Sequence, residues 1–230
     1  LDGLELVANF GGVLEVETPL LCSSTATDLH LASFAVTESS APRTQAFLQT
    51  SPEFAMKRLL AAGSGPIYQL CKAFRAGDLG ERHNPEFTLL EWYRPGWSLA
   101  QLADEVADLL VATLGEALSF NDVDRTTYRT EFEQAFGANP HGLDVTALRA
   151  LVSAHTSFGE VSSLDASSCL DLLFAMVIEP GLGHQRPVFV SGFPASQASL
   201  AQVGVDAAGD RVAMRCEVYV RGMELANGYL

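Results

Sequence analysis

The densest set of side chains that could do chemistry lies between residues 68 and 97, in YQLCKAFRAGDLGERHNPEFTLLEWYRPGW. Two strand-like runs flank a loop that is rich in charges and glycine. Arg75 ends the first run, and an arginine can form a fork with a phosphate, which a lysine does less well. Phe87 opens the second run and offers a flat face to a purine. Asn84 and Arg82 can donate hydrogen bonds from the loop, so these residue types indicate a nucleotide site.

The alternation of the two strands places several polar side chains on one face of the predicted pair. That face holds Gln69, Cys71, Ala73 and Arg75 from the first strand, and Phe87, Leu89, Glu91 and Tyr93 from the second. Polar groups on a buried sheet face are costly unless they are paired. Two interpretations stay open: an ordinary solvent-facing side, or a face that surrounds a ligand.

The elements that must position this loop are strands, then helices, then strands again. Ser51 can cap a helix over residues 51–65, Pro52 suits its first turn, Glu53 complements its dipole and Gly63 ends it. Residues 98–118 are the clearest helix, and residues 120–185 are predicted to form a mostly helical insert. Strand-like patterns cover 12–21, 27–36, 46–51, 66–75, 86–94, 187–193 and 211–228.

This order of elements predicts an α+β fold, an antiparallel sheet that carries helices, in one region over residues 1–230. Hydrophobic residues make up 48% of the chain and charged residues 18%, as in a globular protein with a sizeable core. The regular alternation of a doubly wound fold is missing, and so is a GxxxxGK[ST] phosphate loop. A nucleotide would therefore bind in another way.

Net charge and cysteine spacing limit the partners that we expect. A net charge of −14 disfavours a nucleic-acid partner bound over a broad basic surface, although local arginines can still bind a small anion. No apolar run approaches the roughly 20 residues that cross a bilayer, so we expect no membrane partner. The four cysteines form no CxxC pair. We therefore expect free thiols and a cytoplasmic location.

Residues 47–95, FLQTSPEFAMKRLLAAGSGPIYQLCKAFRAGDLGERHNPEFTLLEWYRP, resemble the catalytic core of class II lysyl-tRNA synthetases. Within that family they are most similar to the elongation factor P β-lysine ligases. GVLEVETPLL, within about 11–21, resembles motif 1, and residues 67–95 resemble motif 2. FPASQASLAQ (193–202) and CEVYVRGMELANGY (216–229) extend the resemblance over most of the chain.

The resemblance implies a role for each matching position. Arg75 corresponds to the motif 2 arginine that binds the α-phosphate of ATP and, with Glu224, is expected to be catalytic. Glu224 is also the expected Mg²⁺ ligand. The residues expected to bind ATP are Arg75, Ala76, Gly77, Asp78, Asn84, Phe87, Glu224 and Leu225, with Phe87 stacked on the adenine. The residues expected to bind the amino acid are Ser51, Pro52, Glu53, Tyr93 and Asn227.

These positions also have alternative interpretations. Ser51 and Glu53 could cap a helix, Asn84 could form a turn, Phe87 and Tyr93 could pack in the core, and Glu224 could be a surface charge. The chain also departs from the family pattern. The family often has an acidic residue two positions after the motif 2 arginine, where this chain has Gly77, and Asp78 follows one position later.

By resemblance, the expected function is an ATP- and Mg²⁺-dependent ligase that activates (R)-β-lysine or lysine and transfers it to a lysine side chain of elongation factor P. Motif 1 implies a homodimer. Motif 1 begins near residue 11, whereas the tRNA synthetases carry an anticodon-binding domain before it, so no tRNA partner is expected. The family continues into motif 3, a glycine-rich segment with an ATP-binding arginine. No such segment precedes Leu230, so we expect the natural chain to extend further.

Two alternatives stay open at this point. One is a catalytic fragment of a lysyl-tRNA synthetase, and the other is a non-catalytic paralogue that acts as a binding or regulatory dimer.

Overall fold

The computed structural model describes residues 12–25, 31–38, 41–80 and 83–230. The chain divides into two compact units, residues 1–96 and 97–230, and each is considered by itself. Within the described ranges, no helix has the length and apolar character needed to span a bilayer.

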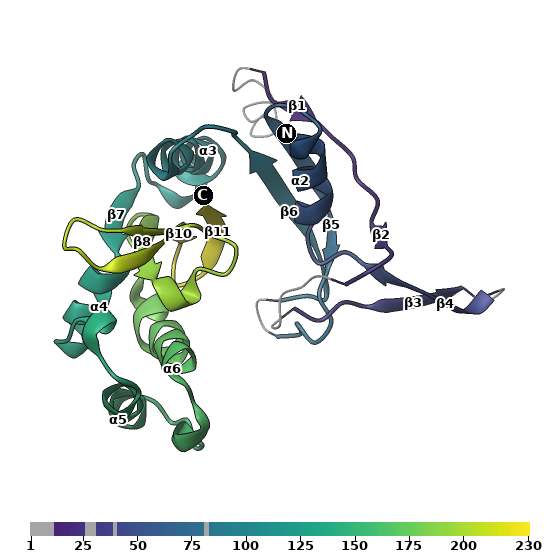
Figure 1. The fold of residues 1–230 in the computed structure, drawn as a ribbon. Helices are drawn as coiled ribbons and strands as arrows, with labels where there is room; N and C mark the ends of the chain where they lie inside the picture. The colour runs from purple at the N-terminus through teal and green to yellow at the C-terminus, as the bar shows by residue number, and fades with distance from the viewer. Residues whose placement is uncertain (1–11, 26–30, 39–40, 81–82) are drawn as a thin grey trace. The chain divides into compact units, whose positions relative to one another are not determined.

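The first unit contains two three-stranded sheets and one described helix (Figure 1). One sheet has the order β1-β5-β6 and the other β2-β4-β3. The pair β1–β5 is parallel, and β5–β6 is antiparallel. The elements are β1 (Leu14–Glu15), β2 (Leu21–Cys22), β3 (Ala35–Glu38), β4 (Ala41–Leu48), α2 (Glu53–Ala61), β5 (Ile67–Phe74) and β6 (Glu86–Tyr93).

The register of β5 and β6 confirms the predicted common face. Gln69 lies opposite Glu91, Cys71 opposite Leu89, and Ala73 opposite Phe87. Directly opposed residues of an antiparallel pair share a face, so the polar side chains of the two strands do lie together.

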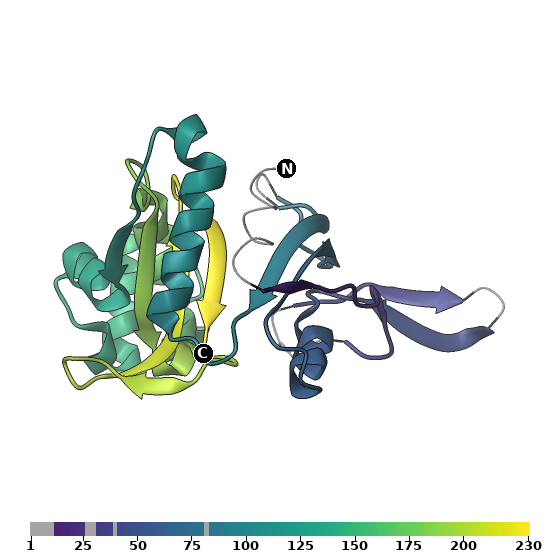
Figure 2. The same ribbon diagram turned by 90° about the horizontal axis from the view of Figure 1, so that it is seen from above.

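The second unit is built on a five-stranded sheet with the path β11-β10-β8-β7, to which β9 adds by pairing with β10 (Figure 2). The pair β7–β8 is parallel, and the other pairs are antiparallel. The strands are β7 (Asp124–Thr127), β8 (Val188–Pro194), β9 (Val203–Val205), β10 (Arg211–Tyr219) and β11 (Glu224–Tyr229).

Helices cover both faces of this sheet, with α3 (Leu99–Leu118) against one face and the helices of residues 128–178 against the other (Figure 1). Ser98 caps α3 in a capping box with Gln101, which explains where this helix begins. The opposite layer contains α4 (Tyr128–Phe136), α5 (Val145–His155), α6 (Ala166–Leu173) and the π-helix η3 (Phe174–Ile178). Short 3-10 turns are η1 (Pro140–Gly142), η2 (Val161–Ser163), η4 (Glu179–Gly181) and η5 (Ala195–Gln197).

Stacked and tilted aromatic rings fill the core between the sheet and the second helical layer. The ring centroid of Tyr128 lies 4.7 Å from that of Phe174 and 5.2 Å from that of Phe193. The Phe174 ring also lies 6.0 Å from that of Tyr219 on β10. Aromatic pairs at such distances stabilise a core beyond their buried area, by about 0.5–1.5 kcal/mol each.

The α+β fold is confirmed, with four corrections in detail. Residues 12–21 contain only the short β1 and the first residue of β2, not one strand. The helix predicted from Ser51 begins at Glu53, and its N-cap, Pro52, makes no side-chain cap. Residues 124–127 form a strand that the sequence did not indicate, and the sheets are mixed rather than wholly antiparallel. The predicted strand over 27–36 lies partly outside the described residues, and 35–36 belong to β3.

Candidate active site

A half-buried polar cluster lies in the first unit, where β6 meets the start of α2. The Glu91 carboxylate accepts hydrogen bonds from Ser51 Oγ and from the Tyr93 hydroxyl, both at 2.6 Å. Ser51 Oγ also accepts the backbone N–H of Glu53 at 3.0 Å. The serine thus fixes the entry to α2 and the orientation of Glu91 together. Ser51 can therefore both position the start of α2 and take part in the cluster.

Burial is the main cause that raises the pKa of Glu91, because it disfavours the charged carboxylate. The hydrogen bonds from Ser51 and Tyr93 lower that pKa, the charge of Glu53 raises it, and the charge of Lys57 lowers it. Lys57 itself is ion-paired with Glu53, at 2.6 Å between Nζ and Oε1. Both hydrogen bonds to Glu91 come from neutral hydroxyls, so the site has room in its charge balance for a cation.

Buried polar side chains extend this cluster along β5. Gln69 is 2% exposed, and its Oε1 accepts a hydrogen bond from the Thr18 hydroxyl at 3.0 Å. Gln49 Nε2 donates to the carbonyl of Lys72 at 2.9 Å and contacts Cys71 Sγ at 3.4 Å. This face of the sheet therefore carries paired polar side chains and is not a purely hydrophobic core.

Arg75 and Phe87 lie together at the other end of the same face. The Arg75 guanidinium carbon is 4.9 Å from the centroid of the Phe87 ring, and Nε donates to the carbonyl of Thr50 at 3.4 Å. The Arg75 backbone N–H donates to the carbonyl of Pro85 at 2.9 Å, which closes the loop between the strands. Stacking on an aromatic ring fixes the plane of a guanidinium and keeps its N–H groups available for an anion.

The loop after Arg75 has a conformation that explains the departure from the family pattern. Ala76 N–H donates to the carbonyl of Ala32 at 2.8 Å, and Gly77 then has a φ of +88°. An acidic residue at position 77 would be strained in that left-handed conformation, whereas glycine is not. Asp78, the next residue, is half-buried, and Asn84 is exposed near the end of the loop. Arg82 lies outside the described residues.

The remaining predicted residues lie in the second unit, on β11. Glu224, Leu225 and Asn227 are all exposed on this strand. Asn227 lies opposite Glu217 of β10, and its Nδ2 is 3.4 Å from Glu217 Oε1. Glu224 lies opposite Tyr219 across a register shift.

Glu217 is a candidate that sequence reasoning missed, because an acidic residue inside an apolar strand has no distinctive spacing. It is only 6% exposed and is hydrogen-bonded to Arg215 and to the Tyr219 hydroxyl as well as to Asn227. Arg215 is held in turn by the carbonyl of Gln197 and by the Phe193 ring, 4.6 Å from its guanidinium carbon. Burial lowers the pKa of Arg215, and the negative charge of Glu224 offsets part of this effect.

Glu91 is the second missed candidate. Its place on the polar face was predictable from the alternation of β6, but only its burial and its two hydroxyl donors distinguish it from a surface acid.

Comparison with known proteins places these features in a family. The family model of class II tRNA synthetases (D, K and N) matches residues 6–230, nearly the whole chain. The chain belongs to this family. The class II fold that the sequence resemblance implied is thereby confirmed. The assignment of the Arg75 loop between β5 and β6 to motif 2 stays a prediction.

Curated relatives within this class II family are elongation factor P–(R)-β-lysine ligases. The chain is 48% identical over 223 residues to the ligase of Edwardsiella ictaluri and 47% identical over 222 residues to that of Pseudoalteromonas translucida. It is 44% identical over 223 residues to the ligase of Sodalis glossinidius. These matches cover 94–95% of this chain and 66% of each relative, so the chain spans just under two thirds of their length.

Proposed function

We propose that this chain is the catalytic part of an ATP-dependent ligase that activates (R)-β-lysine and transfers it to a lysine side chain of elongation factor P. The names of the relatives support this acceptor and this substrate. The proposal covers residues 1–230 as one catalytic region.

The observation that carries the proposal is the Glu91 cluster. The Glu91 carboxylate has its lone pairs oriented by two neutral hydroxyls, and it shares the nearby Lys57 charge with Glu53, so the cluster keeps a net negative charge. An ammonium group of a lysine-type substrate would supply the missing positive charge and strong, charge-assisted hydrogen bonds. Glu53, beside Ser51, adds a second carboxylate, which suits a substrate with two amino groups. Pro52 is buried and fixes the turn between them.

The Arg75–Phe87 pair fits the nucleotide side of the reaction. We propose that the adenine stacks near the Phe87 ring and that Arg75 binds the α-phosphate, with Ala76, Gly77, Asp78 and Asn84 as nearby contacts. A carboxylate oxygen of the amino acid attacks the α-phosphorus, and the bond to the β-phosphate breaks to release pyrophosphate. Arg75 offsets the charge that develops on the phosphate, which is electrostatic stabilisation by a group already in position.

The second step joins the acyl group to the acceptor. The acceptor amine forms a bond to the acyl carbon, the bond from that carbon to the phosphate oxygen breaks, and AMP leaves with the electron pair. The amine loses a proton in this step.

The second unit offers a donor set for Mg²⁺. Mg²⁺ in nucleotide sites takes one or two carboxylates and fills its other positions with phosphate oxygens and water. Glu224 presents an exposed carboxylate on β11, and Glu217 lies on the paired strand with its oxygens already held by neighbours. The residues fit the ion, and we propose Glu224 as the ligand and Glu217 as its support. Mg²⁺ would neutralise phosphate charge. Leu225 and Asn227 would contact ATP and the amino acid, respectively.

We also propose a homodimer and a cytoplasmic location, with no tRNA substrate. Leu14, Leu20 and Leu21, within the motif 1 segment, are 57%, 39% and 53% exposed. Apolar side chains exposed in one segment favour a protein partner. The four free cysteines suit a reducing compartment.

ATP–pyrophosphate exchange by the full-length protein, with (R)-β-lysine against α-lysine, tests the proposal. Exchange that is faster with (R)-β-lysine supports the ligase. A clear preference for α-lysine would instead indicate a lysyl-tRNA synthetase, and no exchange with either would indicate a non-catalytic paralogue.

A further inference from the structure

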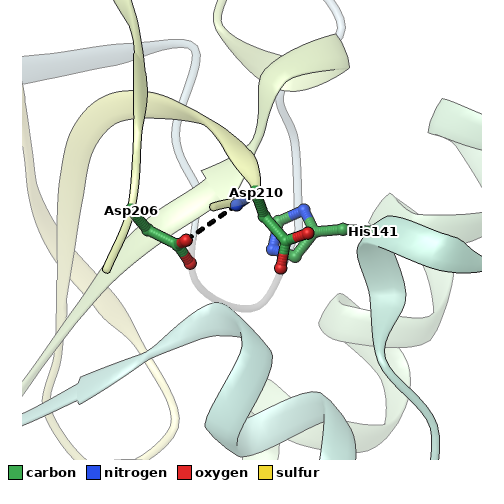
Figure 3. Close-up of side chains that lie close together, drawn as sticks. All are labelled: His141, Asp206 and Asp210. Atoms are coloured by element: carbon green, nitrogen blue, oxygen red, sulfur yellow. Dashed lines mark hydrogen bonds between the residues drawn. The ribbon is translucent and has the colours of Figure 1, made fainter. Parts of the chain in front are cut away.

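Three side chains with metal-ligating atoms meet in the second unit, and they come from two segments far apart in the sequence. Figure 3 shows His141 from η1 beside Asp206 and Asp210 from the loop between β9 and β10. One ring nitrogen of the histidine and one oxygen of each carboxylate lie within 4.8 Å of one another. A single ion could therefore contact all three groups.

The loop between β9 and β10 holds its two carboxylates in place. Asp206 Oδ1 accepts the backbone N–H groups of Ala208 and Asp210, both at 2.9 Å. The Asp206 N–H donates to the carbonyl of Asp210 at 3.0 Å, and Gly209, with a φ of +89°, allows the tight turn. Asp206 Oδ1 is thus used by the loop, and its other oxygen is available to a ligand.

A 3-10 turn holds the histidine on the opposite side. Asn139 Oδ1 accepts the His141 backbone N–H at 3.0 Å, and Pro140 sets the first turn of η1. Both sides of the cluster are therefore built by local backbone hydrogen bonds, not by contacts among the three side chains.

One ring nitrogen of the cluster, His141 Nε2, is buried without a hydrogen-bond partner in the described part of the chain. A buried polar atom without a hydrogen bond costs about 1–3 kcal/mol. Asp210 Oδ2 is buried too, but Arg129 Nη2 lies 2.9 Å from it in an ion pair. The unpartnered imidazole nitrogen is an observation independent of the residue types, and a bound cation would satisfy it.

The charge around the cluster is negative. Arg129 Nη2 lies 2.9 Å from Asp210 Oδ2, and Arg129 Nε lies 3.2 Å from Glu133 Oε1. The three carboxylates of Asp206, Asp210 and Glu133 thus face one guanidinium, which leaves an excess of negative charge for a cation. Arg129 fixes the orientation of Asp210, as groups beside a ligating carboxylate commonly do.

We propose that His141, Asp206 and Asp210 bind a divalent transition-metal ion that links η1 to the β9–β10 loop. One imidazole nitrogen with two carboxylate oxygens suits Zn²⁺ or Mn²⁺, whereas Mg²⁺ and Ca²⁺ favour oxygen alone. Water would complete the coordination. This site takes a different ion through different residues from the proposed ATP site, and it stands or falls independently of the ligase function.

Calorimetric titration of the metal-free full-length protein with Zn²⁺, in the presence of a phosphine reductant, measures this site. Asp206→Asn is the most informative variant, because the amide oxygen can still accept the two loop N–H groups. We expect Asp206→Asn and His141→Gln each to weaken Zn²⁺ binding by at least about tenfold. His184→Gln and Asp108→Asn change the same residue types at exposed positions and should leave binding unchanged.

Co²⁺ absorption spectra separate this site from adventitious binding by the four cysteines. Nitrogen and oxygen ligands give weak visible bands, whereas thiolates add a strong charge-transfer band. The proposal is supported if the wild type binds one equivalent of Co²⁺ and shows only the weak bands. Both site variants should lose this binding while their circular dichroism spectra stay unchanged. No stoichiometric binding, a thiolate band, or equal affinity in wild type and both variants would overturn it.

Discussion

Replacement of Glu91 by glutamine separates the binding role of this carboxylate from its effect on stability. The variant keeps the size of the side chain and removes the charge that we propose pairs with the substrate ammonium. A hydrogen bond to a charged group contributes about 1.5–3 kcal/mol. At 1.4 kcal/mol per factor of ten, we expect kcat/KM for the amino acid to fall about 10- to 150-fold. The KM for ATP should change little, because Arg75 and Phe87 lie at the other end of the face.

The stability of Glu91→Gln should change in the opposite direction. The pKa of Glu91 is raised by burial, so the folded protein binds this proton more tightly than the unfolded chain. The contribution of Glu91 to stability is therefore greatest below the unfolded pKa and declines as pH rises through the higher folded pKa. At neutral pH the glutamine variant, which has no such buried charge, should be at least as stable as the wild type.

The assays are ATP–pyrophosphate exchange with varied amino acid and urea unfolding at several pH values. Glu86→Gln is the matched control on the same strand, since Glu86 is exposed and 3.6 Å from Lys72 in a surface ion pair. We expect this control to alter neither activity nor stability by much. The reasoning is refuted if Glu91→Gln binds the amino acid as well as the wild type does, or if it loses activity only because it is unfolded.

Three further predictions concern other parts of the chain. Arg75→Lys keeps the charge but loses the planar fork, so the rate of ATP–pyrophosphate exchange should fall about 10²-fold. Arg58→Lys, on the exposed face of α2, should leave that rate unchanged. Equal exchange rates in the two variants would contradict the phosphate role of Arg75. Gly183→Ala should destabilise the fold in urea by about 1–3 kcal/mol more than Gly209→Ala. Both glycines have positive φ, but only at Gly183 would a Cβ lie 2.3 Å from a β10 carbonyl oxygen, so equal losses would contradict the packing. Burial raises the pKa of Cys216 to about 11. At pH 8, on the order of one Cys216 side chain in a thousand is therefore a thiolate, and alkylation in the native protein should be slow. Rapid alkylation of Cys216, detected by peptide mass spectrometry, would contradict its burial.

The sequence predicted the shared face of β5 and β6 because a period of two is a strong local signal. The same alternation could not decide whether Glu91 faced solvent or a site, since that depends on burial by α2 and on the hydroxyl of Ser51. The register confirmed the face, and the hydrogen bonds then showed the cluster.

β7 could not be predicted, because Asp124–Thr127 is a short polar segment with mostly exposed side chains. It is a strand only because the backbone of β8 lies beside it, which is a tertiary effect. His141 likewise has no local relation to Asp206 and Asp210, and only the fold brings them together. Family resemblance predicted roles for Arg75 and Glu224. It did not predict that Arg75 stacks on Phe87 or that Arg215 supports Glu217.

The most direct test of the proposed function is the mass of elongation factor P after incubation with the full-length protein, ATP and (R)-β-lysine. We expect the addition of one β-lysyl group to a lysine side chain. This addition should depend on ATP and should be lost in Arg75→Lys and Glu91→Gln at limiting substrate. An unchanged mass, with an active acceptor and both substrates present, would contradict it.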